Sequence, residues 1–193
     1  MKNVIFEPWV GDNYVNGFNG KKILALGDSQ YGDVENSAHK LVEHFIGYKN
    51  GNIVHMAWMN TYAKFSNVLL GEKADGKTTI DFWNSIVFYN YVQKSQTGHS
   101  ITPLDEDYDN SHNAFIEILE EYQPDLIIVW GWSLWGRTAK YGMEADFTIL
   151  EDKKEKFYYF EINGKKIPAC GIPHPRVLSK DWTPYLQEAI KLA

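Results

Sequence analysis

Apolar and polar positions form alternating blocks along the chain. Continuous apolar runs predict strands at residues 22–26, 86–90 and 125–129. Apolar residues at helical spacing predict helices over residues 34–46, 61–70, 111–122, 131–141 and 181–192. Alternating strands and helices are typical of α/β proteins, so we expect a three-layer α/β/α sandwich with a mainly parallel central sheet.

The intervening segments carry turn and loop signals. Residues 157–162 and 165–172 flank the pair Asn163-Gly164, which suits a type I′ turn, and they predict a hairpin at one edge of the sheet. Residues 52–56 predict a short extended segment. The polar stretch 93–110 predicts a long surface loop, followed by a helix with Ser111 as its N-cap.

The chain of 193 residues has the length of one domain and shows no repeat or linker. We therefore expect residues 1–193 to form a single domain. Residues 1–20 are rich in Gly, Asn and aromatic residues. They are predicted to form an ordered arm packed on that domain.

Polar residues follow each predicted strand. Gly27-Asp28-Ser29-Gln30-Tyr31-Gly32 comes after the first strand, and Asn90 ends the second. Trp130-Gly131 ends the third, and His174 lies between two prolines after the hairpin. Because binding sites in parallel α/β sheets form outside the carboxyl ends of the strands, we expect these segments to converge on one crevice.

The residue types in this set suit recognition of a polar ring and movement of protons. The amide of Asn90 offers an acceptor and two donors in one plane. His174 can donate to a developing oxyanion, and Asp28 can orient a water molecule. Each also has an ordinary structural explanation, as a turn amide, a surface imidazole or a capping acid. Their joint position at strand ends favours the functional interpretation.

Composition narrows the function classes. Aromatic residues make up 15% of the chain, which provides surfaces for stacking flat rings. The single cysteine, Cys170, excludes an intrachain disulfide and a cysteine-rich zinc site, and its apolar neighbours indicate a buried thiol. A net charge of −6 argues against tight nucleic-acid binding, although it leaves room for a local basic patch. We expect neither a metal nor a cofactor.

Targeting signals are missing from the sequence. Residues 1–20 lack the apolar core of a signal peptide, and no run approaches the ~20 apolar residues of a membrane span. A cytoplasmic protein that does not interact with membranes is therefore expected. The oligomeric state stays open.

The order of the polar segments resembles that of the uracil-DNA glycosylase superfamily. Gly27-Asp28-Ser29-Gln30-Tyr31-Gly32 resembles its first motif, of the GQDPYH or GEAPG kind, and Asn90 resembles the asparagine that ends its central strand. Trp130-Gly131 is similar to the pair after the penultimate core strand, and His174-Pro175-Arg176 to the start of the HPS motif. The resemblance spans roughly residues 22–180.

Three departures separate this chain from the best-known members. The water-activating Asp of GQDPYH falls on Ser29, and Asp28 takes the place of the Glu in GEAPG. Arg176 stands where the third residue of HPS is serine. Residues 81–90 look like those of an uncharacterised branch with GESHYG-like first motifs. These differences put uracil cleavage in doubt and leave the fold expectation intact.

The resemblance implies a role for each candidate residue. A target base would be extruded from a nucleic acid into the pocket, where Asn90 hydrogen-bonds its edge and Tyr31 or Phe65 stacks on it. His174 would stabilise charge on the leaving base, and Asp28 the sugar cation or a water. Gly27, Ser29 and Gln30 would complete the binding loop, with Arg176 on a flanking phosphate. DNA or a nucleobase-containing small molecule is the expected partner.

Two other function classes remain open. Residues 23–29 also resemble the first block of the SGNH hydrolases, which would make Ser29 the nucleophile of a GDS-type esterase. The later Gly-x-Asn-Asp and Asp-x-x-His blocks are missing, since Gly131 leads into Trp132 and Gly171 precedes His174 by three residues. The third class is a non-catalytic nucleobase- or nucleic-acid-binding protein that kept the pocket and lost the reaction.

Overall fold

The computed structural model describes residues 1–31, 37–98, 101–150 and 153–193. Within these ranges, the strands are β1 (Trp9–Val10), β2 (Ile23–Gly27), β3 (Ile86–Asn90), β4 (Leu126–Trp130), β5 (Met143–Leu150), β6 (Lys153–Ile162) and β7 (Lys165–Ile172). The helices are α1 (Ala38–Lys49), α2 (Met59–Leu70), α3 (Gly76–Trp83), α4 (Asp105–Tyr122), α5 (Trp132–Ala139) and α6 (Thr183–Leu192), the last preceded by a 3₁₀ turn at Lys180–Trp182.

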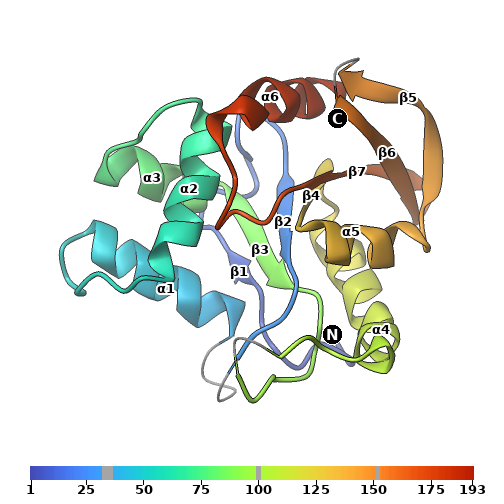
Figure 1. The fold of residues 1–193 in the computed structure, drawn as a ribbon, viewed down its shortest axis with the longest axis horizontal. Coiled ribbons are helices and arrows are strands. Elements are labelled where there is room, and N and C mark those ends of the chain that lie inside the picture. The colour runs from blue at the N-terminus through green and yellow to red at the C-terminus, as the bar shows by residue number, and fades with distance from the viewer. Residues whose placement is uncertain (32–36, 99–100, 151–152) are drawn as a thin grey trace.

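The strands form one mixed sheet in the order β1-β3-β2-β4-β7-β6-β5 (Figure 1). The four central strands, β3, β2, β4 and β7, are parallel to one another. Antiparallel pairing occurs at both edges, where β1 joins β3 on one side and β6 and β5 extend the sheet on the other. The α/β fold with a parallel centre is therefore confirmed, and the sheet as a whole is mixed.

Successive residues of the central strands point to opposite faces of the sheet, as the two-residue period of a strand requires. Ile23 and Ala25 pack in a core with residues of α1, α2, α3 and α6. Leu24 and Leu26 pack in a second core with residues of α4 and α5. Continuous apolar runs form these strands because both of their faces are buried.

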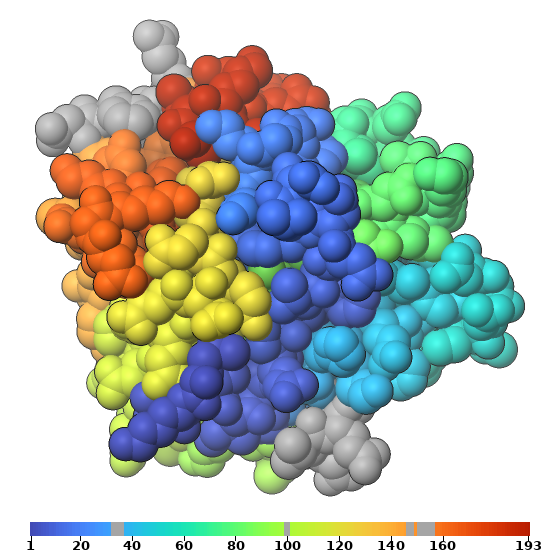
Figure 2. All heavy atoms as spheres, turned by 180° about the vertical axis from the view of Figure 1, so that it is seen from behind, coloured from blue at the N-terminus to red at the C-terminus, as the bar shows by residue number. Residues whose placement is uncertain are grey.

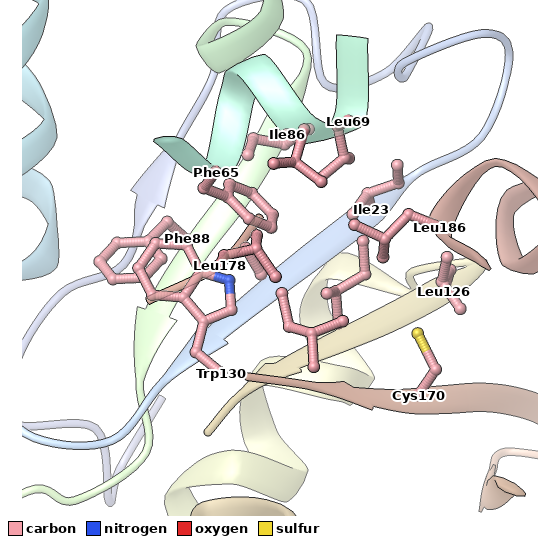
Figure 3. Packing of buried hydrophobic residues seen from close by; sticks show 14 of the residues in the cluster. Ile23, Phe65, Leu69, Ile86, Phe88, Leu126, Trp130, Cys170, Leu178 and Leu186 are labelled. Carbon is pink, nitrogen blue, oxygen red and sulfur yellow. The ribbon is translucent and has the colours of Figure 1, made fainter. Parts of the chain in front are cut away.

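The first core contains the single cysteine. Figure 3 shows Cys170 among apolar side chains, including Leu126 and Leu186. Burial raises the pKa of the Cys170 thiol, whereas reactive thiols have a lowered pKa. The prediction of a buried thiol is confirmed.

The N-terminal segment packs on the body of the protein. Trp9 and Val10 pair with β3, and the Trp9 indole donates a buried hydrogen bond of 2.8 Å to the Trp83 carbonyl. Phe6 and Tyr14 are also buried. Figure 2 shows this segment, in dark blue, lying across the surface beside α1 and α4. Strand pairing and buried aromatic side chains thus hold this segment against β3 and α3.

The Asn163-Gly164 hairpin is confirmed, with positive φ at both turn residues. Its second strand, β7, runs parallel beside β4, so only its first strand extends toward the edge. The sequence reading missed β5, the outermost strand, which pairs with β6 through irregular register. Residues 52–56 are not a strand, because they follow the left-handed Gly51 after α1 and have no neighbouring strand in the described sheet.

Helix boundaries account for the other corrections. The helix predicted to start at Ser111 starts at Asp105, so residues 105–110 belong to α4 rather than to a loop. Three acidic side chains in its first turn stabilise the helix through the positive end of its dipole. One of them, Asp107, also accepts a hydrogen bond from the Leu104 amide. Ser111 lies inside the helix, where its hydroxyl donates to the Asp107 carbonyl.

The other helices differ from their predicted limits by a few residues. Helix α1 ends at Lys49 and has Ser37 as its N-cap, and residues 34–36 of the predicted helix lie outside the described ranges. Helix α3 (Gly76–Trp83) was not predicted from the sequence. Its N-cap is Asp75, whose carboxylate accepts from the Thr78 amide.

Gly171 lets β7 approach α5 closely. A Cβ at this position would lie 2.7 Å from the Trp135 ring. Gly171→Ala should therefore lower the free energy of unfolding by about 1–3 kcal/mol, measured by urea denaturation. Gly136→Ala is the matched control, because a Cβ there meets nothing within 4 Å and alanine favours the helix. Equal stability of the two variants would contradict this packing.

Candidate functional site

Each of the predicted polar segments lies at the carboxyl end of the central strands. Gly27 ends β2, Asn90 ends β3, Trp130 ends β4, and His174 follows β7 by two residues. These residues border one cavity of about 420 Å³. Its walls are formed by Gly27, Asp28, Ser29, Gln30, Tyr31, Leu41, Trp58, Thr61, Tyr62, Phe88, Asn90, Trp130 and His174.

Sheet topology explains the position of the cavity. Strand β2 lies between β3 and β4, so the chain leaves β2 toward one side for β3 and crosses to the other side for β4. The loops after β2 and β4 therefore separate at this point. A crevice forms where strand order reverses in this way, and ligands commonly bind there.

Backbone pairing holds the first loop against the segment after β3. The amides of Tyr91 and Val92 donate to the carbonyls of Gly27 and Asp28, each at 2.9 Å. Further along, the Gln96 amide donates to the Gln30 carbonyl at 3.0 Å. This pairing continues the β2–β3 ladder beyond the strand ends and fixes the backbone of the candidate binding loop.

Gly27 allows the Asn90 amide to lie against the loop. A Cβ at Gly27 would be 2.3 Å from Asn90 Oδ1 and 3.1 Å from the Phe88 ring. Asn90 is 5% exposed, and its carbonyl accepts a hydrogen bond from Gln93 Nε2. Among the hydrogen bonds of the described residues, none engages the Asn90 side-chain amide, so the amide is available to a ligand.

Aromatic rings form the apolar wall. The Phe88 and Trp130 rings lie 4.8 Å apart, and the Tyr62 ring meets Phe88 edge-on at 5.4 Å. Figure 3 shows the Trp130 indole beside Phe88 and Phe65. Phe65 is fully buried behind this wall, 4.7 Å from Trp130, and does not border the cavity. Phe65 is therefore a core residue rather than a lining residue of the cavity.

Among the residues that the structure describes, several buried polar atoms of the cavity walls have no hydrogen-bond partner. They are Asp28 Oδ1, Ser29 Oγ, both side-chain amide atoms of Gln30, and Trp130 Nε1. Gln30 is 1% exposed and Trp130 3%. An unsatisfied buried polar group costs about 1–3 kcal/mol, so such atoms concentrated in one cavity indicate a place for a polar ligand or water.

His174 presents a neutral imidazole to the cavity. The Arg176 amide donates to its Nδ1 at 3.2 Å, which places the proton of the neutral ring on Nε2. Loss of hydration, reinforced by the Arg176 charge, lowers the pKa of His174 below its usual 6.5. At pH 7 the ring is therefore a neutral donor rather than a cation.

Asp28 has the opposite shift. Burial raises the pKa of its carboxyl above 3.8, while the Tyr108 hydroxyl and the Arg137 charge oppose the rise. The Arg137 guanidinium lies over the Tyr108 ring at 4.2 Å and pairs with Asp105. The Asp28 carboxyl and the His174 imidazole border the same cavity, where a carboxyl with a raised pKa is suited to accepting and returning a proton.

The remaining predicted residues lie at the margins. Tyr31 borders the cavity and is 41% exposed, a position from which its ring can cover a ligand. Ser29 borders the cavity too. Arg176 does not, because it is exposed on an adjoining groove. Gly32, the last residue of the first motif, lies outside the described residues.

Sequence reasoning missed the side of the cavity formed by the first two helices. Leu41 comes from α1, Trp58 precedes α2, and Thr61 and Tyr62 belong to α2. Tyr62 does lie on the apolar stripe predicted for this helix. The pattern marks that stripe as buried, and nothing in it distinguishes core positions from positions facing a cavity.

Neither a metal site nor a membrane span is found in the part of the chain that the structure describes. No group of three His, Cys, Asp or Glu side chains there is arranged to hold a metal ion. Among the described helices, none is long and apolar enough to cross a bilayer.

A scan against protein-family models found no match, and a search of curated proteins found none.

Asp28→Asn should stabilise the protein at neutral pH. The folded state raises the pKa of this carboxyl, so ionising it costs stability as the pH rises from 3.8 through the folded pKa. The gain should be present at pH 7 and should vanish below 3.8, as measured by urea unfolding at several pH values.

Asp109→Asn is the matched control, because Lys140 and Tyr141 lower the pKa of Asp109. That variant should gain nothing at pH 7. An Asp28→Asn variant less stable than the native protein at pH 7 would contradict the burial argument.

Proposed function

We propose that the cavity binds a nucleobase and that the protein is a uracil-DNA glycosylase-like hydrolase acting on an N-glycosidic bond. The unpartnered polar atoms on an aromatic-walled cavity carry this proposal. Asn90, Gln30 and the Trp130 indole offer donors and acceptors at the edge of a flat ring, and Phe88 and Tyr62 offer apolar faces. Nucleobases combine a hydrogen-bonding edge with a stackable face.

In the proposed reaction, His174 and Asp28 each have one role. As the bond between sugar C1′ and the base nitrogen breaks, its electron pair goes to the base, where the Nε2–H of His174 stabilises the negative charge. Asp28 stabilises positive charge at C1′ and accepts a proton from the attacking water. Water supplies the hydroxyl on C1′, and its proton ends on the departed base.

The arrangement of elements supports the family assignment in this proposal. Helices lie on both faces of a sheet with a parallel centre, and the candidate motifs lie at the strand ends in the order that the resemblance requires. We accordingly propose a three-layer, uracil-DNA glycosylase-like sandwich for the whole chain. A cytoplasmic location belongs to the same proposal.

The esterase hypothesis has weaker support. Ser29 Oγ borders the cavity but makes no hydrogen bond. An esterase of this type activates its serine through a base within hydrogen-bonding reach. His174 borders the same cavity, and its Nδ1 accepts from the Arg176 amide instead. Within the described part of the chain, the serine therefore has no activating partner.

Asn90→Ala should weaken nucleobase binding by roughly 10- to 100-fold, because a buried base edge loses its hydrogen bonds. Quenching of tryptophan fluorescence by nucleosides measures this, since Trp58 and Trp130 border the cavity. Asn113→Ala, on the exposed surface of α4, is the matched control and should bind like the native protein. Equal affinity of the two variants would remove Asn90 from the binding site.

His174→Ala should lower the rate of base release at least ~100-fold. The assay uses single- and double-stranded oligonucleotides containing uracil, hypoxanthine or xanthine, and alkaline cleavage reveals abasic sites. His44→Ala, an exposed histidine of α1, is the control and should retain full activity.

Native-like activity of His174→Ala would exclude the catalytic role. Nucleoside binding without base release by the native protein would favour the non-catalytic alternative.

A further inference from the structure

A second cavity, the basic groove, adjoins the candidate site. It has a volume of about 580 Å³ and is bordered by Lys49, Lys64, Lys73 and Arg176. The four cations come from the end of α1, from α2, from the segment after α2 and from the loop after β7. No aspartate or glutamate is among the described residues that border it. In a chain of net charge −6, four cations without an acid form a local reversal of charge.

Two of these lysines are held close to each other. Lys49 lies 5.6 Å from the centre of the Phe45 ring, so its position is restrained by α1. Partial burial and the charge of Lys73 lower the pKa of Lys49. Within the described ranges, no ion pair includes any of the four cations of the groove. Like charges kept together without an anion favour the binding of one.

The groove and the candidate site share one lining residue and a loop. Thr61 borders both cavities. Lys64 Nζ donates to the Arg176 carbonyl at 2.7 Å, and the Arg176 amide donates to His174 Nδ1. A continuous set of hydrogen bonds therefore joins α2, the groove and the imidazole. Through Thr61 and the loop that carries His174 and Arg176, the groove lies next to the candidate site.

We infer that the basic groove binds the phosphate groups of the molecule whose base enters the cavity. This inference rests on the proposed function and makes the substrate a phosphorylated one rather than a free base. Lysine and arginine are the usual phosphate-binding side chains, and neutralised phosphates dominate the affinity of nucleic-acid complexes. The phosphates belong either to a nucleotide or to a strand.

Binding measurements with four probes test the inference. The probes are inorganic pyrophosphate, a nucleoside, its 5′-monophosphate and a single-stranded oligonucleotide of the same base. We expect the two nucleotide probes to bind at least ~10-fold more tightly than the nucleoside. If the 5′-monophosphate binds as tightly as the oligonucleotide, the phosphates belong to a nucleotide. If the oligonucleotide binds more tightly than the monophosphate, the phosphates belong to a strand. The logarithm of its affinity should then fall with the logarithm of the salt concentration, with a slope of about −0.7 per contacted phosphate.

The variant Lys49→Gln/Lys73→Gln removes two of the four charges without changing the candidate site. It should lose most of the phosphate-dependent gain, and Lys73→Glu should do the same with no change to the buried stem of Lys49. Lys166→Gln/Lys180→Gln, which alters two exposed lysines outside the groove, is the charge-matched control. Thermal unfolding establishes that each variant folds.

The outcomes separate the two proposals. If the nucleoside does not bind the native protein, the proposed function is contradicted. In that case, loss of pyrophosphate and oligonucleotide binding in the groove variants would still support phosphate binding by the groove. Unchanged affinity for all phosphate probes in both groove variants overturns the inference. Equal native affinity for the nucleoside and its phosphorylated forms also overturns it.

Discussion

Parallel pairing between β2 and β3, continued past both strand ends, is the constraint on which the candidate site depends. The ladder extends through the carbonyls of Gly27 and Asp28, and this fixes the loop before any side chain contributes. The same close approach needs a residue without a Cβ at Gly27, because Asn90 occupies that space. The sheet therefore orders the binding loop and positions the amide beside it in one arrangement.

The cavity stores unfavourable interactions that the rest of the fold must offset. Among the described residues, the side-chain amide of Gln30 and the Trp130 indole are buried without hydrogen-bond partners, and the Asp28 carboxyl is partly removed from water. Elsewhere in these core strands, apolar side chains fill both faces. Buried polar side chains without partners are expected where a protein binds a ligand, because the ligand supplies the missing hydrogen bonds. The two cores on either side of the sheet support this local cost.

The net charge of the chain and the local charge beside the cavity have opposite signs. The chain is acidic overall, and the electrostatic argument from net charge opposes binding to polyanions. Yet α1, α2, the segment after α2 and the loop after β7 bring four cations together beside the cavity. Electrostatic attraction depends on charges within about 8–10 Å, so the local arrangement has more influence on a bound phosphate than the total does.

Sequence pattern alone was sufficient for the central strands, the hairpin turn and the group of polar residues at the strand ends. Strand burial, the positive φ of an Asn-Gly turn and the convergence of parallel strand ends are local or topological consequences of residue order. Tertiary structure alone decided that Trp58, Thr61 and Tyr62 complete the cavity, that Phe65 packs against Trp130 outside the cavity lining, and that lysines distant in sequence share a groove. Those contacts depend on how helices dock on the sheet, and helical periodicity records which face is buried without recording what that face meets.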